Sequence, residues 1–112
     1  MRPDHGLVGM TGLPAKPVAA AAFFYQRILP QVELIKDGDV TILFPTVDSA
    51  HEGWMRAAVQ DLAREAAPRR VNAVVGDDDA AIQSAIDWLD QAPSITGQLL
   101  AVDGNPAGNP AQ

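Results

Sequence analysis

The sequence has no cysteine, so disulfide bonds and thiolate chemistry are excluded. Aromatic residues make up only 5% of the 112 residues, which predicts a core of small aliphatic side chains. No apolar run is long enough to cross a bilayer. The first residues also lack the continuous apolar stretch of a secretory signal. We therefore expect a cytoplasmic protein without a membrane-bound segment.

Basic residues are also scarce. Eight lysines and arginines stand against fourteen acidic residues, which gives a formal net charge of −6. Proteins that bind the phosphate backbone carry a basic patch, so a nucleic-acid partner is not expected. The length suits one domain with a small core.

Apolar runs and turn residues divide the chain into alternating strands and helices. The expected strands cover residues 6–10, 39–44, 70–75 and 98–102. The expected helices cover residues 17–30, about 49–67 and about 79–91. Pro17 suits a first helical position, Pro30 and Pro68 are expected to end the first two helices, and Asp77 or Asp78 is expected to cap the third.

The order βαβαβαβ, with continuous apolar strands, predicts an α/β fold. Helices would cover a parallel sheet of about four strands. We expect one domain over residues 1–103. Residues 104–112 contain a repeated Gly-Asn-Pro-Ala unit and are expected to form a flexible tail.

Several motifs resemble the C-terminal half of the short-chain dehydrogenase/reductase (SDR) family. They are "RVNAV" at 70–74, "ITGQ" at 95–98, "VDGN" at 102–105, "GDVTILFPT" at 38–46 and "LVGMTG" at 7–12. The resemblance implies a truncated, Rossmann-like three-layer fold. It also implies a left-handed last crossover, which would place the final helix on the opposite face of the sheet.

The cofactor motif of the family has no counterpart here. The family holds its dinucleotide with a glycine-rich turn after the first strand. Gly6, Gly9 and Gly12 have the wrong spacing for such a turn. The first strands and helices of the family fold also have no match, so we expect the front half to be missing and no cofactor to bind.

The catalytic residues of the family, a Tyr-x-x-x-Lys pair and a serine, also have no match. The only tyrosine is Tyr25, and Leu29 stands four residues later. Aligned with the family, Asp48 and Glu52 occupy the tyrosine and lysine positions, and Pro45 occupies that of the serine. Two acids cannot replace a phenol whose pKa a lysine lowers. We therefore expect no catalytic residue in this chain.

Two acidic groups suggest either chemistry or helix starts. Asp48, His51 and Glu52 could form a metal or acid–base cluster, or Ser49 and Glu52 could form a capping box. Residues 77–79 could bind a divalent cation, or they could favour the positive end of a helix dipole. Neither group has the ligand spacing of a known metal motif. We favour the helix starts and expect no metal site.

Large apolar side chains are the candidates for contact with a partner. We name Phe24, Trp54, Met55, Val59 and Trp88 as candidate interface residues. Trp54 and Met55 fit an interface anchor and ordinary core equally well. Trp88 is expected to pack its helix on the sheet as part of the core. Asn72, in the "RVNAV" motif, is expected to make structural hydrogen bonds with the backbone.

The first hypothesis is a non-catalytic SDR-like protein. It would act as a structural or regulatory subunit, as a homo-oligomer or with a full-length dehydrogenase. The alternative is a complementing half of an NAD(P)-dependent oxidoreductase whose partner supplies the cofactor site and the catalytic residues. A third hypothesis, ranked last, is a small-molecule site near Pro45, Thr46 and Gly76, because ligands bind at such strand ends.

Overall fold

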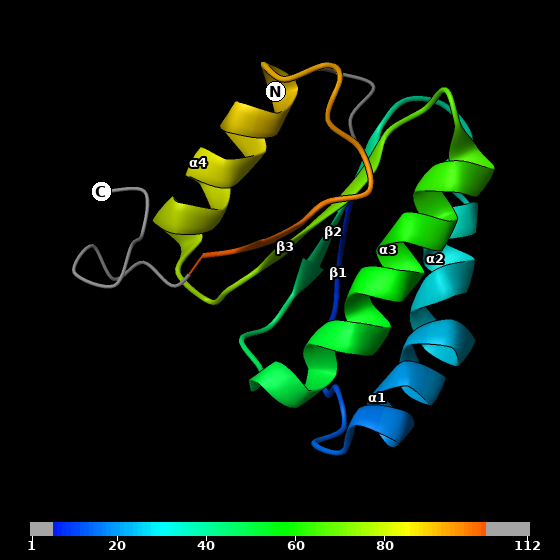
Figure 1. The fold of residues 1–112 in the computed structure, drawn as a ribbon, viewed down its shortest axis with the longest axis vertical. Helices are drawn as coiled ribbons and strands as arrows, with labels where there is room; N and C mark the ends of the chain where they lie inside the picture. Colours follow the sequence, from blue (N-terminus) through cyan, green and yellow to red (C-terminus); the bar gives the residue numbers. More distant parts are fainter. Residues whose placement is uncertain (1–5, 103–112) are drawn as a thin grey trace.

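The computed structural model describes residues 6–102 and contains one four-stranded, all-parallel sheet (Figure 1). Its spatial order is β1-β2-β3-β4, the order of the sequence. The strands are β1 (Gly6–Gly9), β2 (Val40–Phe44), β3 (Val71–Val75) and β4 (Leu99–Ala101). The expected α/β class and βαβαβαβ order are confirmed. The expected tail at 104–112 lies outside the described residues.

The first helical segment is longer than expected. It consists of α1 (Pro17–Phe23), a π-helical turn η1 (Phe24–Ile28) and α2 (Leu29–Glu33). Pro30 does not end the helix, so this expectation is wrong. Proline has no N–H and clashes with the preceding helical turn. Here the turn widens before Pro30, with the Leu29 N–H bonded to the Phe24 carbonyl, and Pro30 enters the first turn of α2.

The other two helices follow the expected pattern. A short 3-10 turn η2 (Ser49–His51) leads into α3 (Glu52–Ala66), and α4 (Asp79–Asp90) follows β3. Ala67 is extended (ψ 138°), because the residue before a proline disfavours the helical region. Asp78 caps α4 by accepting a 2.8 Å hydrogen bond from the Ala81 N–H, so one of the two expected caps is confirmed.

Helices lie on both faces of the sheet. Helices α1, α2 and α3 cover one face, and α4 lies alone on the other (Figure 1). The core between the sheet and the first three helices includes Ile42, Phe44 and Met55. A second, smaller core joins α4 to Val74. Because the strand order is sequential, the β3–β4 crossover has the opposite hand to the earlier two, as the resemblance implies.

Candidate functional site

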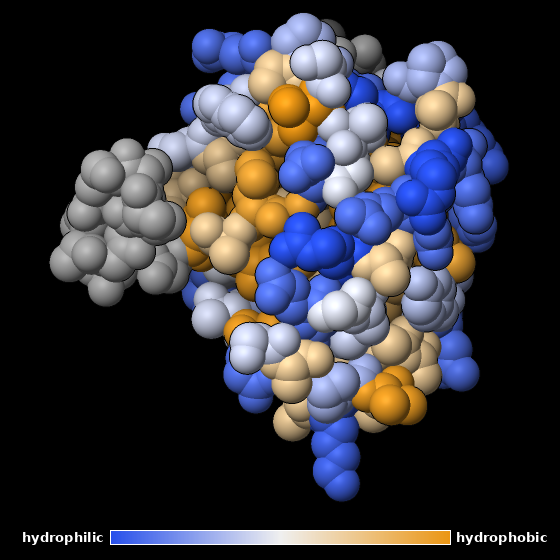
Figure 2. All heavy atoms as spheres, viewed as in Figure 1, coloured by the Kyte–Doolittle hydropathy of each residue, from blue (hydrophilic) through white to orange (hydrophobic). Residues whose placement is uncertain are grey.

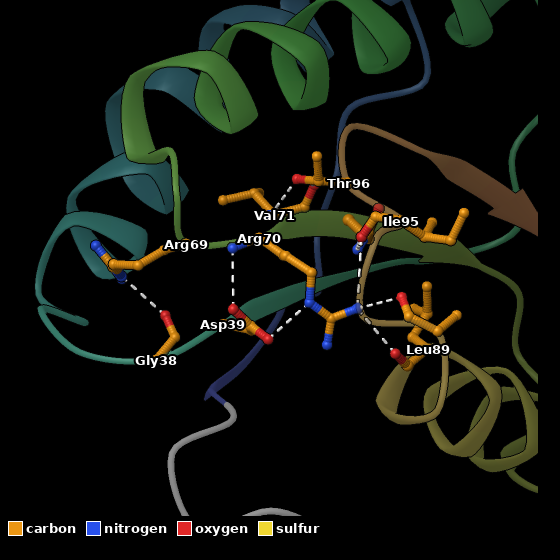
Figure 3. Close-up of polar contacts among 10 residues, drawn as sticks. Gly38, Asp39, Arg69, Arg70, Val71, Leu89, Ile95 and Thr96 are labelled. Atoms are coloured by element: carbon orange, nitrogen blue, oxygen red, sulfur yellow. Dashed lines mark hydrogen bonds and ion pairs between the residues drawn. The ribbon is translucent and has the colours of Figure 1, made fainter.

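The most connected polar side chain belongs to Arg70, at the entry to β3 (Figure 3). It is 7% exposed. Its backbone N–H and Nε donate to the two carboxylate oxygens of Asp39 at 2.9 and 2.8 Å. Its Nη1 donates to the carbonyls of Leu89 and Ala92, at the end of α4. A cation is favourable there because the helix dipole is negative. Arg70 therefore ties α4 to the sheet.

Asn72 extends the same network. Its Nδ2 donates to the Ile95 carbonyl at 3.1 Å, and its Oδ1 accepts from the Gln98 N–H at 3.0 Å. The Thr96 Oγ1 accepts a 3.0 Å hydrogen bond from the Val71 N–H. The structural role expected for Asn72 is confirmed. The "RVNAV" and "ITGQ" motifs thus form one polar strap between β3 and the chain entering β4.

The carboxyl ends of the strands are where open α/β sheets bind ligands. Gly76 donates to the Phe44 carbonyl at 3.0 Å, and a Cβ at Gly76 would overlap the Val102 carbonyl oxygen. The Thr46 N–H donates to Asp77 Oδ1 at 3.4 Å. The Gly76 and Thr46 N–H groups therefore have partners within the chain, and these two hydrogen bonds bring no pair of polar side chains together at the small-molecule site of the third hypothesis.

The three residues of the Asp48 cluster have separate roles. Asp48 caps the 3-10 turn by accepting from the Ala50 N–H at 3.0 Å. Glu52 instead pairs with Arg56, one turn along α3, at 2.6 Å. The expected capping box is wrong, because Asp48 caps the segment from the position before Ser49. Within residues 6–102, no three His, Cys, Asp or Glu side chains are placed to hold a metal.

His51 is buried and serves as a structural link. Its Nδ1 accepts a 3.1 Å hydrogen bond from Trp54 Nε1, and its Nε2 lies 2.9 Å from the Ala15 carbonyl. An indole can only donate, so the proton of the neutral ring is on Nε2, which donates to Ala15. This bond joins the loop before α1 to η2, directly before α3. The signal in the sequence is the tryptophan three residues after the histidine.

Tyr25 has an environment opposite to that of an activated tyrosine. Partial burial raises the pKa of its phenol, and the carboxylates of Asp61 and Glu65 on α3 raise it further. Neighbouring negative charge disfavours the phenolate, whereas a lysine would stabilise it. The only tyrosine in the sequence is therefore poorly suited to act as a base near neutral pH.

This environment predicts a late titration of Tyr25. We expect the folded chain to form phenolate with a midpoint above the ordinary value of 10.0. The native state then holds its proton more tightly than the unfolded chain, so this group lowers stability as the pH rises above 10. Ultraviolet absorbance reports it without ambiguity, since Tyr25 is the only tyrosine. Asp61→Asn should lower the midpoint, and an unchanged midpoint would contradict this assignment.

Three of the candidate interface residues are buried inside the chain. Phe24, Met55 and Val59 lie in the core beneath α1–α3, so in this fold the sheet and helices of the chain itself cover their side chains. Their helices turn these side chains towards the sheet: the Phe24 ring is 5.7 Å from that of Phe44. Trp54 is partly buried and packs against the same core.

Trp88 differs from its expected place in the core. It is 52% exposed, because Ala85 and Leu89 take the sheet-facing positions of α4. The expected packing of Trp88 on the sheet is therefore wrong. Its exposure leaves it, among the five candidates, as the one most accessible to a partner.

A groove of about 330 Å³ lies at the amino-terminal end of the strands, beside the starts of β2 and β3. Val32, Leu62 and other apolar side chains line it, with Lys36 and Glu65 among its charged residues. Arg69 also lines the groove, but its guanidinium donates to the backbone carbonyls of Ile35 and Gly38. The groove is thus at the amino ends of the strands, away from the usual ligand side.

The described residues form a small parallel α/β domain of Rossmann-like type. A comparison with known families matches residues 8–102 to the SDR-like family described as short chain dehydrogenase-like protein. The chain belongs to this family. No curated protein and no solved structure matches it. Within residues 6–102, no helix has both the length and the apolar character needed to cross a bilayer.

Proposed function

We propose that this chain is a non-catalytic SDR-like subunit with a structural or regulatory role. It associates with copies of itself or with a full-length dehydrogenase. One observation carries the proposal: the residues aligned with the catalytic pair are both committed to the start of a helix. Asp48 caps η2 and Glu52 pairs with Arg56. The raised pKa of Tyr25 supports the same conclusion.

The α4–β4 side of the molecule supports a partner-binding role. Figure 2 shows hydrophobic side chains gathered beside α4, over β3 and β4. Partly buried Ile82, Ile95, Leu100 and Val102 pack against the small core there, and Trp88 is exposed on α4. Tryptophan is enriched among the residues that dominate binding energy at interfaces. We propose Trp88 as the anchor for a full-length dehydrogenase.

Co-purification tests this proposal. The tagged full chain is recovered from its native host, and any dehydrogenase found is purified and titrated back. Trp88→Ala is expected to weaken that complex by about 30-fold or more, the loss of roughly 2 kcal/mol typical of an anchor. Leu34→Ala, which changes an exposed residue at the end of α2, is the control and should have little effect. Equal effects of both changes would contradict the assignment of Trp88.

Reductase assays of the same mixture distinguish the second candidate function, a complementing half of an enzyme, from the first. The outer edge of β1 has no paired strand within residues 6–102, which suits a partner chain that completes the sheet. A complementing half would give reductase activity only when both chains are present. A non-catalytic subunit would bind a dehydrogenase that is already active alone. Activity that requires mixing would replace the first proposal with this one.

A further inference from the structure

Strand β1 has an open edge. It pairs with β2 only, from Gly6 opposite Val40 to Gly9 opposite Leu43, and no other strand within residues 6–102 lies beside it. The Gly6 N–H donates to the Asp39 carbonyl at 2.7 Å, towards β2. The N–H and C=O of one residue point to the same side of a strand, and this side alternates from residue to residue. The N–H and C=O groups of Leu7 and Gly9 are therefore directed towards the open edge.

Within residues 6–102, β1 carries no charged residue and no proline that would oppose pairing at this edge. Native edge strands often carry a charged residue, especially lysine, or a proline, whereas β1 reads "GLVG". In a chain with a net charge of −6, the strand itself contributes no charge that would repel a second copy.

The exposed face of β1 combines a large side chain with an empty position. Val8 belongs to the core beneath α1–α3, so Leu7 and Gly9 face the α4 side. Leu7 is 41% exposed. A Cβ at Gly9 would meet only Leu43, at an ordinary 4.0 Å, so the space over Gly9 is open. Across an antiparallel pair, Leu7 of one copy can cover Gly9 of another.

We propose that β1 pairs with β1 of a second copy of this chain, antiparallel and about a two-fold axis. Leu7 of one copy lies opposite Gly9 of the other and exchanges N–H···O bonds with it, and the axis repeats the exchange. The occupant is a second copy because the strand complements itself in backbone donors and acceptors and in shape, and it carries no charge that would repel a copy. This inference rests on the self-association in the proposed function, and it places the contact between the two copies at β1, away from Trp88.

Sedimentation of the purified full chain tests the pairing. The wild type is expected to be a dimer whose fraction rises with concentration. Leu7→Lys places a charge on the edge, and Gly9→Pro removes an N–H directed away from β2. Each is expected to raise the dimer dissociation constant by at least about tenfold. Leu34→Lys adds the same charge to another exposed apolar position and should leave the dimer intact. Circular dichroism confirms that each variant is folded.

A cysteine cross-link tests the register, since the natural chain has no cysteine. Residues in a hydrogen-bonded antiparallel pair have Cα atoms about 5.5 Å apart, within disulfide range. The double variant Leu7→Cys, Gly9→Cys should therefore form a covalent dimer under mild oxidation, whereas Leu34→Cys should not.

The outcomes separate this inference from the proposed function. A wild-type dimer that both edge changes dissociate, and that cross-links as stated, supports the pairing. A wild-type dimer that neither edge change affects overturns it, while self-association through another surface stands. A chain that is monomeric at every concentration also overturns it and leaves the proposed function to the co-purification with a dehydrogenase.

Discussion

Replacing Arg70 with alanine is expected to lower the free energy of unfolding by about 3–5 kcal/mol, the usual effect of breaking a buried ion pair. The change removes the partner of Asp39, whose side chain is also largely buried. It also removes the side-chain donor to the carbonyls of Leu89 and Ala92, which then keep only their backbone N–H partners. Urea unfolding followed by circular dichroism measures the loss.

Arg64 provides the matched control. It pairs with Asp61 on the exposed side of α3, and exposed pairs contribute about 0–1 kcal/mol. Arg64→Ala should therefore leave the unfolding midpoint nearly unchanged. If both alanine variants unfold at similar urea concentrations, Arg70 does not tie α4 to the sheet in the way described above.

Gly76→Ala is expected to destabilise the chain by about 2–3 kcal/mol, at the upper part of the range for overpacking. The new methyl group would overlap the carbonyl oxygen of Val102. That atom belongs to the backbone, whose Val102 N–H bonds to Val75 at 2.7 Å, so it can move only with the end of β4. Thermal and urea unfolding give the size of the effect.

Gly53→Ala is the companion change. Beyond the adjacent backbone of α3, no atom lies within 4 Å of a Cβ at this position, and alanine in a helix is favoured over glycine by about 0.5–1 kcal/mol. The two glycine variants should therefore shift stability in opposite directions. A shift of the same sign and size in both would contradict the close approach of β4 to Gly76.

Much of this fold follows from local signals. Continuous apolar runs at 39–44 and 70–75 predict buried parallel strands, and both form. The extended residue before Pro68 ends α3 where expected. The placement of α4 on the opposite face does not follow from the apolar pattern, because both faces of a parallel sheet bury apolar residues. The family resemblance supplied that expectation.

Other features depend on tertiary contacts that the sequence pattern does not encode. The helix passes Pro30 because the preceding turn widens, and Phe24 and Ile28 of that turn lie in the core. The apolar stripe of α4 includes Trp88, but the buried residues of this helix are Ala85, Ile86 and Leu89. Propensity gives the helix, whereas the neighbouring elements decide its boundary and orientation.

Only part of the candidate site follows from the sequence motifs. The family alignment replaces the catalytic pair with Asp48 and Glu52, and the structure gives each a local partner. The structural role of Asn72 also followed from its motif. The burial of His51 did not, because its partner carbonyl at Ala15 lies 36 residues earlier. Such a contact depends on how α1 packs beside α3.

Titration of the purified full chain with NADH and NADPH tests most directly whether the chain is non-catalytic. Nicotinamide fluorescence and calorimetry measure binding, with a full-length dehydrogenase as the positive control. We predict no saturable binding up to roughly 1 mM, the upper end of ordinary substrate affinities. Stoichiometric binding at micromolar concentration by the chain alone would contradict the account, since it would require a cofactor site that the motifs and the strand ends do not provide.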